Sequence, residues 1–123
     1  MDQKELGKVE KVTVGYEDHG CFTLYIHITF GAVHQAFGGY RLDEWSKKLD
    51  RSVGTVAGMD MLCQLTKLFD VDDLHKAVGK YVWAIRESDS WSSPIIALER
   101  PQPDGGATFR VNDWKSQWFG SQP

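Results

Sequence analysis

The sequence has few cysteines and no long apolar run. Its 123 residues include two cysteines, Cys21 and Cys63, so we expect two free thiols and no disulfide framework. The longest stretch without aspartate, glutamate, lysine or arginine, 21–40, contains His27, His34 and several glycines. It is too polar for a membrane helix, which needs about 20 mostly apolar residues. The first residues contain no apolar signal segment, so we expect a cytoplasmic protein.

An excess of basic residues is also missing. Lysine and arginine number 14 against 17 aspartate and glutamate residues, which gives a net charge of -3. Proteins that bind duplex DNA or an anionic membrane surface carry a broad positive field, so we expect neither partner. The 41% of hydrophobic and 25% of charged residues are typical of a folded protein. The length of 123 residues predicts a single domain, 1–123.

Hydrophobic periodicity predicts an α+β fold. Alternation of apolar and polar residues predicts strands at 8–16, 22–30, 33–40, 80–86, 94–98 and 107–111. Apolar residues at spacings of three and four predict one main amphipathic helix at 53–69. The charged segment 42–52 before it is expected to be an exposed connection. The order β-β-β-α-β-β-β gives an antiparallel sheet of five to six strands covered by the helix.

The apolar faces of the second strand and the helix are expected to share one core, because a small domain has only one core to share. The strand contributes Phe22, Leu24, Ile26, Ile28 and Phe30, and the helix contributes Met61, Leu62, Leu65 and Phe69. The opposite face of the sheet, with Tyr25 and either Val82 or Trp83, has no second layer in this scheme. We therefore expect a homo-oligomer, a dimer or larger.

The ionisable residues form no familiar catalytic or metal motif. His19 and Cys21 lie two residues apart, a spacing that fits no zinc module. The cluster of Asp70, Asp72 and Asp73 lacks the glycine and distal glutamate of an EF-hand loop. A nucleophile pair of Cys21 and His19 is the alternative, although no third group orients it. We expect a protein that is not an enzyme and that has no metal or cofactor.

The end of the third predicted strand is the first candidate for a ligand site. Phe37, Gly38, Gly39 and Tyr40 combine two aromatic rings with two glycines. Glycine lets backbone N–H groups approach a bound anion closely. The alternative is a β-bulge, the commoner role of paired glycines in a strand.

Two arginines form the second candidate. Arg51 precedes the predicted helix, where the helix dipole and free N–H groups favour an anion; the alternative is that Ser52 is a plain N-cap. Arg110 alternates away from the apolar face of the last strand and lies beside Asn112. Both arginines could equally be solvated surface residues. Trp83 adds a ring that can stack on a base.

Tryptophan is frequent near the end of the chain. Five are present, and Trp91, Trp114 and Trp118 lie in the final third. The segment 114–119 mixes tryptophan with polar residues, which fits either a subunit interface or a ligand pocket.

Five sequence blocks carry a resemblance to a known family: GYEDHG at 15–20, QAFGGY at 35–40, GTVAGM at 54–59, GKYV at 79–82 and PIIAL at 94–98. Together they resemble small proteins encoded by phages and prophages, similar to the phage inhibitors of the Thoeris defence system. Those inhibitors sequester the cyclic ADP-ribose signal of a TIR enzyme without cleaving it, and some also bind cyclic oligonucleotides. The segments 100–106 and 116–123 look longer than the family pattern.

The resemblance implies an anti-defence protein in the cytoplasm of the bacterial host. Its ligand would be a small anionic nucleotide of the cyclic ADP-ribose type. The candidate residues from the sequence pattern would bind it: Phe37, Gly38, Gly39, Tyr40, Arg51, Trp83, Arg110 and Asn112. The alternative is a phage accessory protein that inhibits a host protein by direct contact through its tryptophan-rich end.

Overall fold

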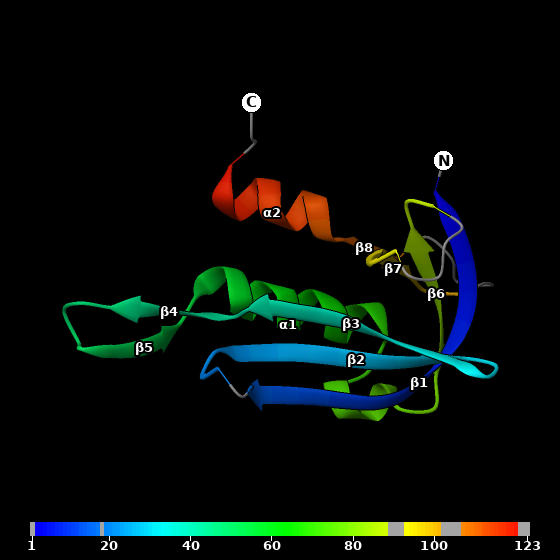
Figure 1. Cartoon of the computed structure of the whole chain (residues 1–123), viewed down its shortest axis with the longest axis horizontal. Coiled ribbons are helices and arrows are strands. Elements are labelled where there is room, and N and C mark those ends of the chain that lie inside the picture. Colours follow the sequence, from blue (N-terminus) through cyan, green and yellow to red (C-terminus); the bar gives the residue numbers. More distant parts are fainter. Residues whose placement is uncertain (1, 18, 89–92, 102–106, 121–123) are drawn as a thin grey trace.

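The computed structural model is an α+β fold built on a six-stranded antiparallel sheet (Figure 1), which confirms the predicted class. It describes residues 2–17, 19–88, 93–101 and 107–120, so Trp91 lies outside the described residues. The strand order is β3-β2-β1-β6-β7-β8, and β4 and β5 form a separate two-stranded sheet. The elements are β1 Gln3–Tyr16, β2 Phe22–Phe30, β3 Val33–Arg41, β4 Asp43–Ser46, β5 Arg51–Gly54, α1 Val56–Leu68, a 3-10 turn Leu74–Ala77, β6 Tyr81–Arg86, β7 Ile95–Glu99, β8 Thr108–Arg110 and α2 Val111–Phe119.

Strand β1 joins the two halves of the sheet. Its first part, from Gln3 to Lys8, pairs with β6, and its later part, from Lys8 to Tyr16, pairs with β2. A bulge between Val9 and Lys11 interrupts the register, and bulges bend the strand that contains them. Figure 1 shows β1 curving from the β2–β3 meander toward β6 and β7. The strand is longer than the predicted 8–16 because its polar first half has its own pairing partner.

The core lies between the sheet and α1, as predicted. Leu24, Ile26 and Ile28 of β2 are fully buried and belong to one cluster with Met61 and Leu65 of α1. Alternation along β2 therefore has the expected phase, with Tyr25 and His27 on the other side. We call that other side, turned away from α1, the open face.

Helix α1 begins later than predicted. Thr55 is its N-cap, and the Thr55 side chain accepts a hydrogen bond of 2.9 Å from the Gly58 N–H. Ser52 and Val53, expected to begin the helix, instead belong to β5 and pair with β4. The predicted connection 42–52 is therefore wrong in part: it contains a β4–β5 hairpin that projects from the sheet (Figure 1).

Arg100 holds the other end of α1. Its Nε donates to the carbonyl oxygen of Leu68 at 2.8 Å, and its Nη2 donates to that of Lys67 at 2.7 Å. The last carbonyls of a helix have no partners within the helix, and a cation also opposes the negative end of the helix dipole. Both ends of α1 are thus fixed by side chains that lie outside it.

The C-terminal segment contains a second helix, which the hydrophobic periodicity does not predict. Helix α2 follows β8 without a loop, since β8 ends at Arg110 and α2 begins at Val111. Figure 1 shows α2 on the same side of the sheet as α1. The prediction of one main helix is corrected to two. No helix in the described ranges is long and apolar enough to span a membrane.

Candidate functional site

Two tryptophans of α2 fasten it to the first half of α1. The indole N–H of Trp114 donates to the Ala57 carbonyl oxygen at 2.9 Å, and that of Trp118 donates to Asp60 Oδ2, also at 2.9 Å. Trp114 is buried and Trp118 is half-buried. Because these two bonds fix the position of α2, they also determine the shape of the two hollows that it helps to form.

The first hollow, which we call the aromatic cleft, lies between α2 and the end of β3. It has a volume of about 310 Å³ and is lined by Tyr40, Arg41, Trp114, Lys115, Phe119 and Gly120. The Trp114 ring centroid lies 6.0 Å from that of Tyr40 and 5.5 Å from that of Phe119, both in edge-to-face arrangements. Lys115 Nζ lies 5.4 Å from the centre of the Tyr40 ring. The cleft therefore combines three aromatic rings with two cations.

Arg41 is oriented by a buried carboxylate. Its Nε donates to Asp43 Oδ1 at 2.9 Å, and the same oxygen accepts the Phe22 N–H at 3.2 Å. The hydrogen bond to Asp43 raises the pKa of Arg41, so the guanidinium keeps its charge. Within the described part of the chain Arg41 uses only Nε for a hydrogen bond, which leaves its terminal nitrogens for a ligand. Burial raises the pKa of the Tyr40 phenol, which stays uncharged at neutral pH.

The predicted glycine pair forms a β-bulge. Gly38 and Gly39 have φ angles of 127° and 83°, and the register between β2 and β3 shifts there, between Thr23 and Tyr25. A Cβ on Gly38 would collide with the carbonyl oxygen of Leu24. The alternative given for this pair, a bulge, explains both glycines without a ligand. Phe37 beside them is buried in the core.

The remaining predicted ligand residues do not line the cleft. The placement of Arg51 before a helix is wrong, because it lies in β5 of the exposed hairpin. Trp83 and Arg110 belong to the open face of β6 and β8, where Lys4 Nζ lies 5.0 Å from the Trp83 ring and Arg110 Nη1 lies 3.8 Å from Asp2 Oδ2. Asn112 is exposed in the first turn of α2. Of the eight predicted residues, only Tyr40 lines the aromatic cleft.

The sequence pointed to both segments that form the cleft, but it did not indicate that they lie side by side. Tyr40 and Arg41 end the glycine-containing strand, and Trp114 and Phe119 belong to the tail left open as interface or pocket. Lys115 was not singled out. The spacing of Trp114 and Trp118 by four residues is a helical signal, and it could have placed these rings on one helix.

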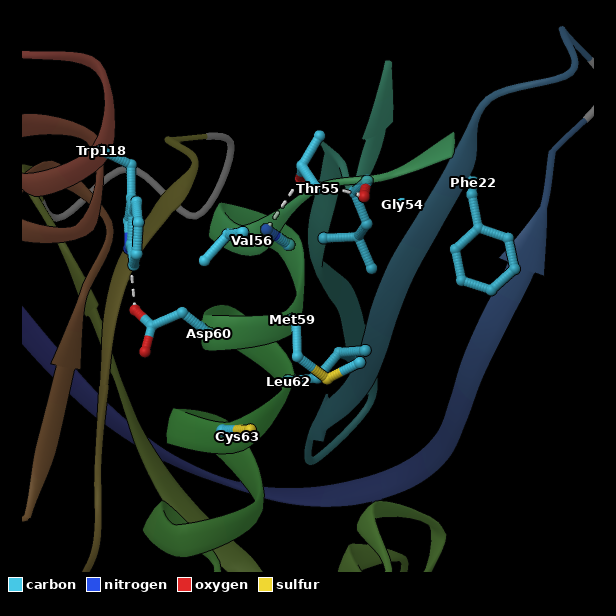
Figure 2. A pocket seen from close by; sticks show the side chains of 11 residues that line it. Phe22, Gly54, Thr55, Val56, Met59, Asp60, Leu62, Cys63 and Trp118 are labelled. Atoms are coloured by element: carbon cyan, nitrogen blue, oxygen red, sulfur yellow. Dashed lines mark hydrogen bonds between the residues drawn. The ribbon is translucent and has the colours of Figure 1, made fainter. Parts of the chain in front are cut away.

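The second hollow, which we call the α1 groove, is larger and mostly apolar. It has a volume of about 600 Å³ and is lined by Phe22, Leu42, Gly54, Thr55, Val56, Gly58, Met59, Asp60, Leu62, Cys63 and Trp118. In Figure 2, Trp118 and Phe22 lie on either side of the α1 side chains. Val56 is 70% exposed and Met59 61% exposed. Asp60, the acidic residue of the groove, already binds Trp118 and Gln64, so the groove suits an apolar occupant and not an anion.

The histidines and Cys21 lie outside both hollows, whereas Cys63 lines the α1 groove. In the ranges that the structure describes, no three histidine, cysteine, aspartate or glutamate residues gather into a metal-binding group. His19 Nδ1 lies 3.6 Å from Glu17 Oε1 at an exposed turn. On the open face, His27 Nδ1 lies 3.3 Å from His34 Nε2. Burial, and then the charges of His34 and Lys11, lower the pKa of His27. Cys21 and Cys63 are free thiols, as predicted.

A scan of protein-family models finds no match to this chain, and no curated protein or solved structure matches it. The functional argument therefore depends on the geometry of the cleft and the groove.

Proposed function

We propose that the protein binds a small anionic nucleotide in the aromatic cleft and sequesters it without cleaving it. The observation that carries the proposal is the grouping of Tyr40, Trp114 and Phe119 with Arg41 and Lys115 around one hollow. Rings and cations in one concave site match the two parts of a nucleotide, its flat base and its phosphate. In an infected bacterium, such a protein would act against defence by removing a cyclic ADP-ribose type of signal.

Each part of the ligand has a matching group. A base that stacks on the exposed Phe119 ring gains about 1–3 kcal/mol. A phosphate that accepts charge-assisted hydrogen bonds from Lys115 and Arg41 gains about 1.5–3 kcal/mol from each. A cleft of about 310 Å³ lies at the small end of ligand sites, so it can cover a base and a phosphate while the sugars remain at its mouth.

Retention without cleavage follows from the chemistry of the lining. Its ionisable side chains are Tyr40, Arg41 and Lys115, which bind and orient an anion. Cleavage of a pyrophosphate or glycosidic bond needs a base, a nucleophile or a metal at the reacting atom. We therefore expect the ligand to leave the protein chemically unchanged.

Calorimetric titration with isomers of cyclic ADP-ribose and with cyclic di- and trinucleotides tests the proposal. We expect binding of at least one of these compounds, and chromatography after denaturation of the complex should recover that compound intact. If every compound in the panel fails to bind, the proposed ligand class is wrong. Recovery of a cleaved product would instead identify an enzyme.

Matched variants place the binding in the cleft. Lys115→Ala and Phe119→Ala should weaken binding, because they remove a cation and a stacking ring. The controls are Lys67→Ala and Met59→Ala on α1, where Met59 is 61% exposed and Phe119 is 62% exposed. Equal losses of affinity in variants and controls would contradict a site in the cleft.

The α1 groove favours a second function, direct binding to a host protein. Val56 and Met59 are strongly exposed apolar side chains at the edge of a hollow of about 600 Å³, and exposed apolar patches mark protein interaction sites. In this case Met59→Glu should abolish the inhibition of the host protein while nucleotide binding stays intact. Phe119→Ala should have the opposite effect, which separates the two functions.

A further inference from the structure

Two histidines on the open face of the sheet form a pair that the proposed function does not use. His27 lies on β2 and His34 on β3, the edge strand of the sheet. His27 Nδ1 and His34 Nε2 are 3.3 Å apart, and the two ring centroids are 5.4 Å apart. Neither residue lines the aromatic cleft or the α1 groove. The pair is therefore a separate feature of the molecule.

The register of the β2–β3 hairpin brings the two rings together. His34 is directly opposite Thr29, and His27 is directly opposite Ala36. The two histidines are thus diagonal neighbours on one face, within reach of each other's side chains. Ala36 carries only a methyl group, which leaves room beside His27 for the second ring. The short turn between β2 and β3 keeps this register fixed.

The spacing of the two nitrogens matches that of ligands to one metal ion. Imidazole nitrogens lie about 2.0–2.1 Å from zinc, so two of them at a tetrahedral angle are about 3.3 Å apart. The observed separation of His27 Nδ1 and His34 Nε2 is 3.3 Å. In the free pair one N–H lies between the two nitrogens. When an ion binds there, that proton moves to the outer nitrogen of the same ring, and both inner lone pairs become available.

We propose that His27 and His34 form an open binding site for one divalent late transition-metal ion of the zinc, nickel or copper class. Water molecules fill the remaining coordination positions, since two imidazoles supply only part of a coordination shell. Imidazole suits these ions, and their affinity for one site generally rises from nickel to copper and falls again at zinc. We therefore expect copper(II) to bind most tightly.

The neighbouring charge gives a prediction specific to this site. Lys11 on β1 is directly opposite His27, so its ammonium group opposes a cation on the histidine pair. Lys11→Glu should therefore raise the affinity for the ion, and Lys11→Ala should raise it less. If the two histidines had a purely structural role, the affinity for the ion would not rise from the wild type to Lys11→Ala and again to Lys11→Glu.

Titration of the untagged protein with zinc, nickel and copper(II) ions tests the proposal. Wild type should bind one ion per chain. Loss of the hydrogen-bond partner of a metal ligand lowers metal affinity roughly 10- to 100-fold. His27→Ala and His34→Ala remove a ligand itself, so each should lower the affinity at least as much. His19→Ala and His75→Ala are the controls, because both side chains are exposed and lie outside the pair. Circular dichroism verifies that every variant is folded.

Electron paramagnetic resonance of the copper(II) complex supplies a second measurement. The wild-type spectrum should show coupling to two imidazole nitrogens, and each single variant should show one. Unchanged binding in the double variant His27→Ala/His34→Ala would overturn the proposal. A loss of binding in His19→Ala would also overturn the proposal, because the ion would then be bound at the turn beside Glu17.

Discussion

The indole N–H of Trp114 donates a hydrogen bond of 2.9 Å to the backbone carbonyl oxygen of Ala57. The bond is buried, and it joins the first turn of α1 to the helix that forms one wall of the aromatic cleft. Trp114 also contacts Tyr40 and Phe119 edge to face. One side chain therefore both holds α2 in place and positions the rings proposed to receive a base.

Replacing this donor should lower stability. Trp114→Phe keeps an aromatic ring but removes the N–H, and we expect a loss of about 1–3 kcal/mol in the free energy of unfolding. Trp45→Phe is the matched control, because Trp45 is exposed on the β4–β5 hairpin and should change stability by only about 0.5 kcal/mol. Urea denaturation followed by circular dichroism measures both. Equal losses would mean that the bond to Ala57 contributes nothing.

The bulge in β3 should be intolerant of a side chain. Gly38→Ala places a Cβ against the Leu24 carbonyl oxygen at a φ angle of 127°, and we expect a loss of at least about 2 kcal/mol in the free energy of unfolding. Gly15→Ala serves as the control, since a Cβ there meets no atom within 4 Å. A Gly38→Ala protein that melts like the control would show that the backbone can rearrange at the bulge.

Burying a charge in the core should prevent folding. Ile26 is fully buried against α1, and an uncompensated carboxylate there costs several kcal/mol. Ile26→Asp should therefore lose its cooperative melting transition, whereas Val56→Asp at the exposed start of α1 should keep it. A melting temperature of Ile26→Asp within a few degrees of the wild type would contradict the assigned face of β2.

Affinity measurements can separate the cleft from the arginine site predicted by the sequence. Lys115→Ala should cost about 1.5–3 kcal/mol of nucleotide binding free energy. Arg51→Ala and Arg110→Ala should leave binding unchanged, because neither residue lines the cleft. The reverse result would return the site to the two arginines and remove the cleft from the proposal.

We expect the open face to mediate association between copies of the chain. Leu6 and Tyr81 are exposed there, and the half-buried Trp83 lies opposite Leu6. We expect a dimer or a larger homo-oligomer in light scattering. Leu6→Lys should dissociate it, because it removes an exposed apolar side chain and adds a third lysine beside Lys4 and Lys8 on this face of β1. A monomer mass for the wild type at micromolar concentration would contradict the expectation.

The class, the main sheet and the core could be predicted because their signal is local and periodic. Ile26 and Leu65 each lie on an apolar face whose period identifies the element, and a domain of this size has one core in which to bury both faces. The β4–β5 hairpin was missed because its exposed residues, such as Trp45, give no alternation with a buried side. Helix α2 was missed because only Val111 and Trp114 are buried in it.

The candidate site was harder to predict than the fold because it joins distant segments. Tyr40 and Trp114 are 74 positions apart in the sequence (114 minus 40). Their rings come into contact only when the sheet and both helices have packed together. The glycine pair attracted attention for its freedom to contact a ligand, yet the close approach of the Leu24 carbonyl already requires it. Composition cannot distinguish a glycine needed by a ligand from one needed by a neighbouring strand.

Strand β8, at one edge of the sheet, continues into α2 without a loop. The first residue of α2, Val111, is buried in the core, and the pairing of β8 with β7 therefore determines where the helix begins. The indole hydrogen bonds of Trp114 and Trp118 then determine how the helix lies against α1. The wall of the aromatic cleft that contains Trp114 and Phe119 is thus positioned by two separate parts of the fold, the edge of the sheet and α1.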